Sequence, residues 1–240
     1  MNMKGIVLAG GYGTRLDPLT RQINKHLLPV WSKPMIYYPI QTLLEAGVRD
    51  IMIVTGGQQG DFLRQLGSGR DFDPALNLHY TYQEGAGGIP DAMRCARNFV
   101  GDDPACVILG DNIFAPGSGK DFTEGFEKGG RILLRKVDDP NRFGVAVIRD
   151  DRITHIQEKP EEFISPYAIT GLYCFDNRVW DVIDTLKASD RGELEVTDIH
   201  RYYLKLGELD HRFCGQWWTD AGTFESLYMA GVLARESDAH

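Results

Sequence analysis

The chain has 240 residues, which is long enough to bury one substantial core, either as a single large domain or as a domain with an elaborated lobe. Its hydrophobic content of 42% and charged content of 25% are typical of a soluble globular protein, and the net charge of -8 argues against nucleic acid or an anionic membrane as the main partner. The apolar runs are too short to span a bilayer and no signal-peptide pattern opens the chain. We therefore expect a cytoplasmic protein without a membrane partner.

A glycine-rich loop follows the first predicted strand, at residues 5–9. Gly10, Gly11 and Gly13 allow positive φ and let a bulky polar group come close to main-chain N–H groups, as phosphates require. Arg15 and Lys25 add two cations, so a charged ligand is the natural complement. The third glycine of a dinucleotide loop and the Gly-Lys-Ser/Thr of a P-loop are both absent. A tight turn between a strand and a helix remains the alternative at this point.

Strands and helices alternate along the first half of the chain. The hydrophobic pattern predicts strands at 50–57, 78–83 and 106–111 and helices at 35–46, 61–66 and 89–99. This order is typical of an α/β fold with a mostly parallel sheet and helices on both faces. Ligands of such sheets bind beyond the C-terminal ends of the strands, where Gly10, Gln83 and Asp111 would meet.

The second half of the chain has shorter strands and tighter turns. We expect strands at 131–137, 144–149, 152–158 and 167–175, and helices at 176–187, 197–206 and 223–233. No linker, repeat or low-complexity segment divides the chain. The sequence therefore predicts one domain over residues 1–240, with a nucleotide-binding half at about 1–115 and a half for the second substrate at about 116–240.

Two aspartates have positions suited to a metal ion. Asp111 ends a buried strand, where a carboxylate can hold Mg²⁺ or cap the next turn. Asp220 can bind a metal or serve as the N-cap of the helix at 223–233. The four cysteines have no C-x-x-C spacing and indicate neither a zinc site nor a disulfide framework.

Two further polar segments are ambiguous in themselves. The amide of Gln83 carries a donor and an acceptor that suit the imide edge of thymine or uracil, but an exposed glutamine in a flexible loop is equally compatible with the pattern. Glu158 and Lys159 end a strand, where a solvated ion pair is the alternative to a binding role. Trp217 and Trp218 are expected to serve packing, with lining of a sugar pocket as the alternative.

Three segments of the chain closely resemble the signature of sugar-1-phosphate nucleotidyltransferases. They are Gly10-Gly11-x-Gly13-Thr14-Arg15-Leu16, Lys25-x-Leu27-Leu28-Pro29-Val30 and the run at 33–39. Within that family the run is most similar to glucose-1-phosphate thymidylyltransferases. The resemblance implies a Rossmann-like nucleotidyltransferase fold and the reaction of dTTP with glucose 1-phosphate to give dTDP-glucose and pyrophosphate, in a pathway that supplies deoxysugars such as rhamnose. The same chemistry with UTP or another sugar 1-phosphate, and a non-catalytic nucleotide- or sugar-binding module, remain alternatives.

The resemblance also implies roles for individual residues. The implied nucleotide contacts are Leu8, Gly10, Gly11, Gly13, Thr14, Arg15, Gln83, Gly88 and Asp111. The implied sugar-phosphate contacts are Gly144, Glu158, Lys159, Ile169 and Arg191. Asp111 and Asp220 would hold Mg²⁺, and the implied catalytic set is Arg15, Lys25, Asp111 and Lys159. Since the sugar phosphate is already anionic, no catalytic base is needed, and positioning and positive charge would supply the catalysis.

The chain departs from the family in two places. Glu84, Gly85 and Ala86 stand where the family usually has prolines, so we expect less sharp selection of the base. Longer thymidylyltransferases continue past the position of His240 with helices that form an interface and a regulatory site. We therefore expect no product feedback through that site, and a homo-oligomer, with a homodimer preferred.

Overall fold

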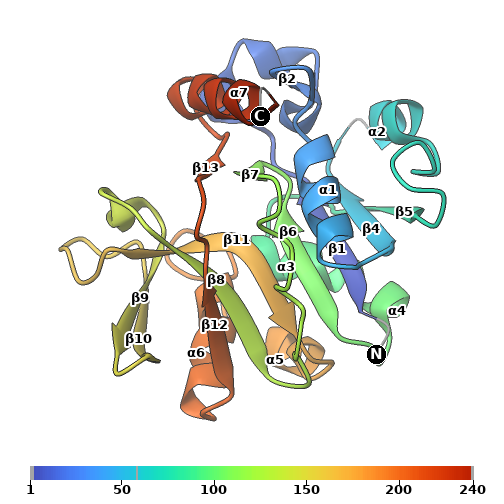
Figure 1. Cartoon of the computed structure of the whole chain (residues 1–240). Helices are drawn as coiled ribbons and strands as arrows, with labels where there is room; N and C mark the ends of the chain where they lie inside the picture. The colour runs from blue at the N-terminus through green and yellow to red at the C-terminus, as the bar shows by residue number, and fades with distance from the viewer. Residues whose placement is uncertain (1–2, 58, 239–240) are drawn as a thin grey trace.

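The computed structural model describes residues 3–57 and 59–238 (Figure 1). Within them a nine-stranded sheet follows the order β10-β9-β11-β6-β1-β4-β5, and β8 pairs with β11 and β12. The first half contributes four strands to this sheet, and they are all parallel: β1 (Lys4–Ala9), β4 (Asp50–Thr55), β5 (Asn77–Tyr82) and β6 (Ala105–Leu109). Their C-terminal ends lie at one edge of the sheet, as expected from the sequence.

Both faces of the parallel strands are covered, which explains their unbroken apolar runs. Ile6 and Leu8 of β1 pack into a core with α3 (Ile89–Arg94) and α4 (Arg97–Val100). Val7 and Ala9 face the other side, toward the helices α1 (Tyr37–Glu45) and α2 (Gln59–Leu66). Successive residues of a strand point to opposite faces, so residues 6–9 of β1 are buried alternately in one core and in the other.

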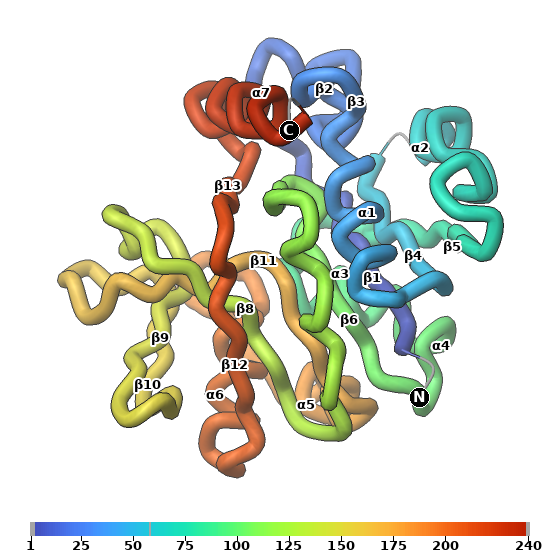
Figure 2. The backbone as a smooth tube through the Cα atoms, viewed as in Figure 1, coloured from blue at the N-terminus to red at the C-terminus, as the bar shows by residue number. Residues whose placement is uncertain are grey.

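The second half of the sheet is largely antiparallel, so the sheet as a whole is mixed. Its strands are β8 (Gly130–Lys136), β9 (Gly144–Arg149), β10 (Arg152–Glu158) and β11 (Tyr167–Phe175). The start of β11 pairs with β9 and its end pairs with β6, with a register shift against β8 between Ile169 and Tyr173. Figure 2 shows the β9–β10 hairpin projecting on the side of the sheet away from α2 and β5.

Several elements differ from the sequence prediction. The predicted helix at 89–99 is two helices, α3 and α4, and the helix predicted at 176–187 is the shorter α5 (Val179–Thr185). The remaining helices are α6 (Val196–Lys205), α7 (Phe224–Asp238) and the 3₁₀ turns η1 (Thr14–Leu16), η2 (Leu19–Arg21), η3 (Lys25–Leu27) and η4 (Pro140–Arg142). The strands that were not predicted are β2 (Pro29–Val30), β3 (Lys33–Pro34), β7 (Asn112–Phe114), β12 (Leu209–Phe213) and β13 (Trp218–Asp220).

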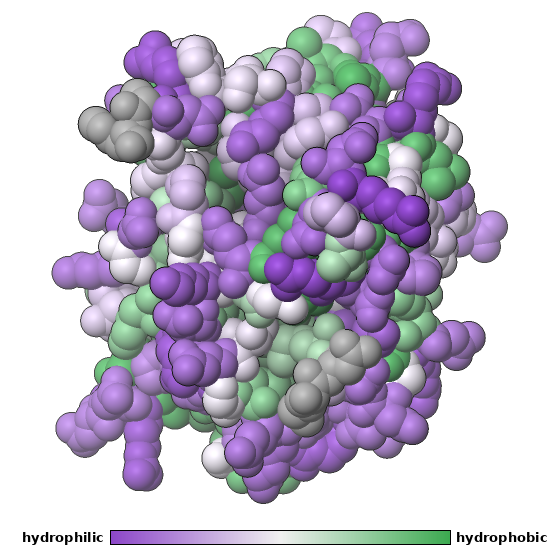
Figure 3. Space-filling view, turned by 45° about the vertical axis from the view of Figure 1, so that its right-hand side comes forward, coloured by the Kyte–Doolittle hydropathy of each residue, from purple (hydrophilic) through white to green (hydrophobic). Residues whose placement is uncertain are grey.

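The last helix packs back on the beginning of the chain. In Figure 1 the red helix α7 lies beside the blue β2 segment, and Ala230 and Ala234 share a small core with Val30 and Met35. No helix in the described residues is long and apolar enough to cross a membrane. The face seen in Figure 3 is mainly hydrophilic, and its hydrophobic side chains lie in small separate patches.

A buried carboxylate ties the second half of the fold together. Asp176, between β11 and α5, is 8% exposed and accepts hydrogen bonds from Gly129 N at 2.7 Å and Tyr203 Oη at 2.8 Å. The Arg178 guanidinium donates to the same carboxylate, with Nε at 2.9 Å from Oδ2. Burial alone would raise the pKa of Asp176, but these donors outweigh it and lower the pKa below its usual value.

We expect Asp176→Asn to lower the free energy of unfolding by about 2 kcal/mol near neutral pH, because an amide NH₂ would face one of these donors. The folded-state pKa lies below the unfolded value, so the carboxylate's contribution is complete above about pH 4 and is lost as the pH falls through the folded pKa. Denaturant unfolding at several pH values measures both effects. Asp181→Asn, at an 85% exposed side chain on α5, is the matched control and should change stability by less than about 0.5 kcal/mol.

Candidate active site

Two adjoining cavities lie beyond the C-terminal ends of the parallel strands. The larger cavity has a volume of about 490 Å³ and the smaller about 240 Å³, and Ile89, Leu109 and Asp111 line both. The smaller cavity contains these predicted site residues: Leu8, Gly10, Gly11, Lys25, Gln83, Gly88 and Asp111. The larger cavity contains Arg15, Asp111, Gly144, Glu158, Lys159, Ile169 and Asp220. Asp111 therefore stands where the two cavities meet.

Asp111 is held by a lysine from the start of the chain. Lys25 Nζ lies 2.5 Å from Asp111 Oδ2, and both side chains are less than one-fifth exposed. Lys25 opens the turn η3, which Asn24 caps by accepting a hydrogen bond from His26 N. Burial would raise the pKa of Asp111, but Lys25 lowers it well below its usual value, so the carboxylate is ionised.

The imidazole beside this ion pair is neutral. His26 is fully buried, and burial lowers its pKa to about 3. Its Nδ1 lies 2.8 Å from Asn24 Oδ1, and its ring packs below Gly110, where an added Cβ would lie 2.8 Å from Cδ2. This packing brings the Lys25 turn against the end of β6, next to Asp111.

Asp220 reaches the site through a short antiparallel pair of strands. β13 pairs with β7 so that Asp220 lies opposite Asn112, and Ala221 N donates to Asp111 O at 2.8 Å. From the sequence, Asp220 could either bind a metal or serve as the N-cap of the last helix. In the structure Thr223 has that position, because its Oγ1 accepts a hydrogen bond from Ser226 N at 3.2 Å.

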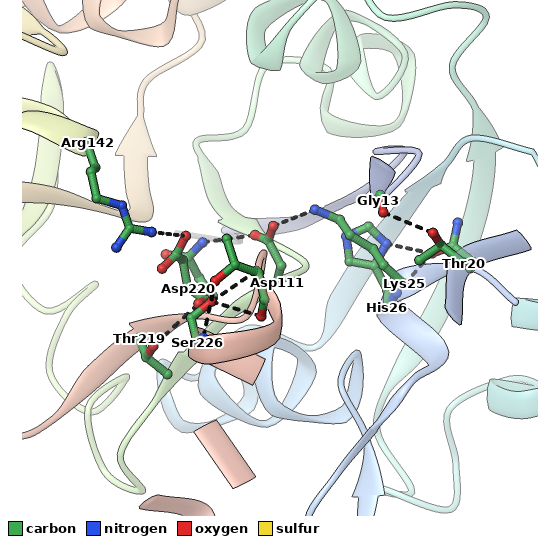
Figure 4. A network of polar contacts seen from close by, with 12 residues as sticks. Gly13, Thr20, Lys25, His26, Asp111, Arg142, Thr219, Asp220 and Ser226 are labelled. Carbon is green, nitrogen blue, oxygen red and sulfur yellow. Dashed lines mark hydrogen bonds and ion pairs between the residues drawn. The ribbon is translucent and has the colours of Figure 1, made fainter. Parts of the chain in front are cut away.

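Cations flank the two carboxylates on both sides, as Figure 4 shows for Lys25 and Arg142. Arg142 Nη2 lies 3.6 Å from Asp220 Oδ2, and the Arg15 guanidinium lies over Gly222, next to the same carboxylate. Burial raises the pKa of Asp220, and the charge of Asp111 raises it further, while Arg142 and Arg15 oppose the shift. No group of three or more possible metal ligands occurs in the described residues. The two carboxylates alone are a donor set suited to Mg²⁺, which takes one or two protein carboxylates and completes its shell with phosphate and water.

Asn112 connects the carboxylate pair to the wall of the larger cavity. Its Nδ2 donates to Asp111 Oδ1 at 3.0 Å, and its Oδ1 accepts from Gly171 N at 3.0 Å and from Trp218 Nε1 at 2.7 Å. Gly171 lies in the part of β11 where the register shifts, so its N–H is available to a side chain. A single amide thus fixes Asp111, β11 and β13 relative to one another.

Acidic and basic side chains alternate at the far end of the larger cavity. Glu158 Oε1 lies 3.3 Å from Arg191 Nη2 and 4.0 Å from Lys159 Nζ, and Arg191 also pairs with Glu195 at 2.8 Å. Lys159 has a φ of 38, which is unusual for a residue with a side chain, and its N–H donates to Phe143 O at 3.0 Å. This backbone conformation holds Lys159 at the end of β10, directly after Glu158.

Three predicted residues lie outside the lining of both cavities: Gly13, Thr14 and Arg191. Gly13 has a φ of 67 and its carbonyl accepts from Thr20 Oγ1 at 2.9 Å, which shapes the turn that presents Arg15. The loop of Arg191 is tied to the smaller cavity, because Leu194 N donates to Gly87 O at 2.9 Å.

Comparison with known proteins identifies the family. The sequence profile for nucleotidyl transferases matches residues 4–237. The chain belongs to the nucleotidyl transferase family. This nucleotidyltransferase is 43% identical to the glucose-1-phosphate thymidylyltransferase of Neisseria meningitidis, over 97% of this chain and 83% of that protein.

Solved structures agree with this assignment. A protein from Bacillus anthracis assigned as a glucose-1-phosphate thymidylyltransferase, in complex with a sucrose, superposes with a TM-score of 0.91 at 49% identity, covering 98% of this chain and 96% of that chain. UDP-glucose pyrophosphorylase complexed with UDP-glucose has a TM-score of 0.86 at 24% identity, with 98% and 99% coverage, and supports the fold alone. The resemblance seen in the glycine loop and the Lys25 segment is therefore confirmed, as are the fold class and the assignment as a nucleotidyltransferase enzyme.

The sequence missed several residues of this nucleotidyltransferase that line the site. Arg142 lies in a segment from which only Gly144 was selected, and Asn112 directly follows Asp111. Trp218 was expected to serve packing, with lining of a sugar pocket as the alternative, and it lines the larger cavity, whereas Trp217 packs against the core beneath α7. Their positions next to predicted residues were the available signal, but the pairing of β7 with β13, which brings Asn112 and Trp218 to the cavity, carries no such signal in the sequence.

We expect Asn112→Ala to lower the free energy of unfolding by about 2–4 kcal/mol, because Gly171 N–H and Trp218 Nε1–H both lose their acceptor. Chemical denaturation measures the change. Asn77→Ala removes an amide that makes an exposed hydrogen bond to Asp50, and should cost less than about 1 kcal/mol. Equal losses in the two variants would contradict the central role of Asn112.

Proposed function

We propose that this nucleotidyltransferase transfers a thymidylyl group from dTTP to glucose 1-phosphate, giving dTDP-glucose and pyrophosphate. The position of Asp111 carries the proposal, since it lies where the two cavities meet, beside Asp220 and between cationic side chains. A base and sugar in one cavity and a sugar 1-phosphate in the other would bring their phosphates together at this point. The identity to curated thymidylyltransferases supports the choice of substrates.

The smaller cavity is assigned to the nucleotide. Gln83 and Gly88 line it and would hold the base, and the N–H groups of the glycine loop would hold phosphates. Arg15 and Lys25 would stabilise the negative charge that collects on the leaving pyrophosphate. This role is electrostatic and needs no proton transfer.

The larger cavity is assigned to glucose 1-phosphate. Glu158 would accept hydrogen bonds from sugar hydroxyls, with Gly144 and Ile169 forming the wall, and Lys159 with Arg191 would bind the phosphate. Held in this way, a phosphate oxygen attacks the α-phosphorus of dTTP as the bond to pyrophosphate breaks. The sugar phosphate is already anionic, so its alignment against another anion is what the residues must achieve.

Asp111 and Asp220 would hold Mg²⁺, and the bound ion would supply positive charge to the phosphates of both substrates. Lys25 is the present partner of Asp111, and it would then be free to move to a phosphate. The homodimer and the division into a nucleotide half at 1–115 and a sugar half at 116–240 remain predictions.

The first test is pyrophosphate release with Mg²⁺ and glucose 1-phosphate, comparing dTTP with UTP and including a control without sugar. We expect release that depends on the sugar and favours dTTP, since the extra methyl of thymine is worth about 1–3 kcal/mol in a fitted pocket. Tight nucleotide binding without release from either nucleotide would instead favour a binding module.

A second test removes one charge from the carboxylate pair. We expect Asp111→Asn to reduce turnover by at least about 10²-fold, because the metal position loses an anionic ligand. Steady-state rates at several Mg²⁺ concentrations measure the effect, and a thermal melt verifies folding. Asp102→Asn, on the exposed turn before β6, is the matched control and should retain full activity. Undiminished turnover in Asp111→Asn would remove Asp111 from the metal site.

A further inference from the structure

The side chain of Gln83 is held in a defined place on the wall of the smaller cavity. Gln83 follows β5 and is 7% exposed, and its backbone N–H donates to Thr55 O at 2.8 Å. This hydrogen bond extends the pairing of β5 with β4 by one residue, so the Cα position is set by the sheet. Only the rotation of the terminal amide remains to be determined.

Asp91 determines that rotation. Gln83 Nε2 donates to Asp91 Oδ2 at 2.8 Å and lies 3.4 Å from the carbonyl oxygen of Gly88. A carboxylate and a carbonyl offer only acceptors, so the NH₂ group must point toward them. Turning the amide over would place Gln83 Oε1 against the Asp91 carboxylate, which is unfavourable. The orientation therefore follows from hydrogen-bond chemistry.

The other end of the amide faces the cavity. A Cβ added at Gly10 would lie 2.9 Å from Gln83 Oε1, so this oxygen lies over the first glycine of the loop after β1. Gly10 and Gln83 both line the smaller cavity. Within the described part of the chain, no group donates a hydrogen bond to Oε1. The sequence predicted a donor and an acceptor side by side, but the structure leaves the acceptor for a ligand.

The loop before α3 is built to bring Asp91 to this position. A Cβ added at Gly87 would lie 2.6 Å from Asp91 Oδ2, so a larger residue at 87 would displace the carboxylate. Arg94 Nη1 lies 3.5 Å from Asp91 Oδ1 and leaves Oδ2 to Gln83. The Asp91 side chain is 29% exposed and does not line the cavity, so it acts through Gln83.

We propose that Asp91 is a positioning residue that fixes Gln83 Oε1 as the acceptor for the base. This inference rests on the proposed function, which assigns the smaller cavity to the nucleotide. Thymine and uracil present a ring N–H at N3, which Oε1 can accept. Cytosine has an unprotonated N3, so two acceptors would meet and neither would be satisfied. Asp91 thus selects imide bases over cytosine, and it does not separate dTTP from UTP.

Equilibrium binding tests the inference without requiring turnover. Titration calorimetry with Mg²⁺ would measure the Kd values of dTTP and dCTP for the wild-type chain, Asp91→Ala and Asp91→Asn. We expect the wild type to prefer dTTP, so that the ratio of the Kd of dCTP to the Kd of dTTP is greater than one. Both variants should lower this ratio by about tenfold or more, which corresponds to the loss of one hydrogen bond.

The two variants should differ in how the preference is lost. Asp91→Ala frees the amide to rotate, so dTTP should bind more weakly. Asn offers either a donor or an acceptor and can hold Gln83 in either orientation, so Asp91→Asn should keep most dTTP affinity and gain dCTP affinity. A purely structural role would weaken both nucleotides together.

Asp184→Asn is the matched control, because Asp184 also pairs with Arg94, at 3.5 Å, but belongs to α5 and makes no contact with Gln83. Its ratio should stay within about twofold of the wild-type value. An unchanged ratio in both Asp91 variants, with the ratio lost in Gln83→Ala, would overturn the inference. A wild type without preference for dTTP would overturn it as well.

Failure of the proposed function is detected separately. Selective dTTP binding without pyrophosphate release would reject the transfer reaction, and the Asp91 variants would still decide the positioning role from their Kd ratios.

Discussion

The active site depends on holding two carboxylates, Asp111 and Asp220, side by side with little exposure to water. Like charges in such a place repel, and the raised pKa of Asp220, to which burial and Asp111 both contribute, reflects this cost. Lys25 offsets the charge of Asp111 from one side and Arg142 offsets that of Asp220 from the other. The pair is therefore stable only in a setting that attracts and concentrates cations, which is also the setting that two phosphate-bearing substrates require.

The sheet supplies the constraint that keeps this arrangement in place. β11 pairs with β9 at its start and with β6 at its end, so one strand spans both halves of the chain. At the change of partner, Gly171 N–H turns to Asn112, which also orients Asp111. A shift of the second half of the sheet relative to the first half would have to break the hydrogen bonds of the Asn112 amide. Burial of the surrounding strands on both faces makes such a shift costly.

The parts of the fold that the sequence predicted well are those encoded by local patterns. β1, β4 and β6 are apolar runs buried on both faces, and glycines mark their ends. β7 and β13 were missed because three-residue strands carry no periodicity, and their pairing partner is distant in the sequence. The helix predicted at 89–99 breaks at Cys95 and Ala96, and Arg94 and Arg97 on either side of the break both pair with Asp184 on α5. Only tertiary contacts contain that information.

Among the site residues too, those with a local motif were predicted and those that depend on tertiary contacts were missed. Lys25 and Asp111 were predicted from their motifs, and the structure adds that they form an ion pair with each other. Asp91 carries no motif, and its contact with Gln83 depends on the approach that Gly87 permits. Glu84, Gly85 and Ala86 stand where the family usually has prolines, and from the sequence they favoured less sharp selection of the base. In the structure the loop lacks the stiffness of proline rings, but Gln83 donates a hydrogen bond to the charged Asp91 carboxylate. This bond fixes the amide that would contact the base.

If the larger cavity binds the sugar phosphate as proposed, the ion pairs at its far end would link the recognition of phosphate to the recognition of sugar. Arg191 is held by Glu158 and Glu195, and Lys159 is also near Glu158. If a phosphate takes Arg191 and Lys159, as proposed, Glu158 loses its cationic partners and its oxygens become available to hydroxyl donors. Each cation exchanges one anionic partner for another, and the Glu158 carboxylate exchanges its ion pairs for hydrogen bonds from the sugar hydroxyls. An acidic protein could in this way bind an anionic sugar without a large excess of positive charge, because the Glu158 carboxylate released from the cations is the group that would then bind the sugar.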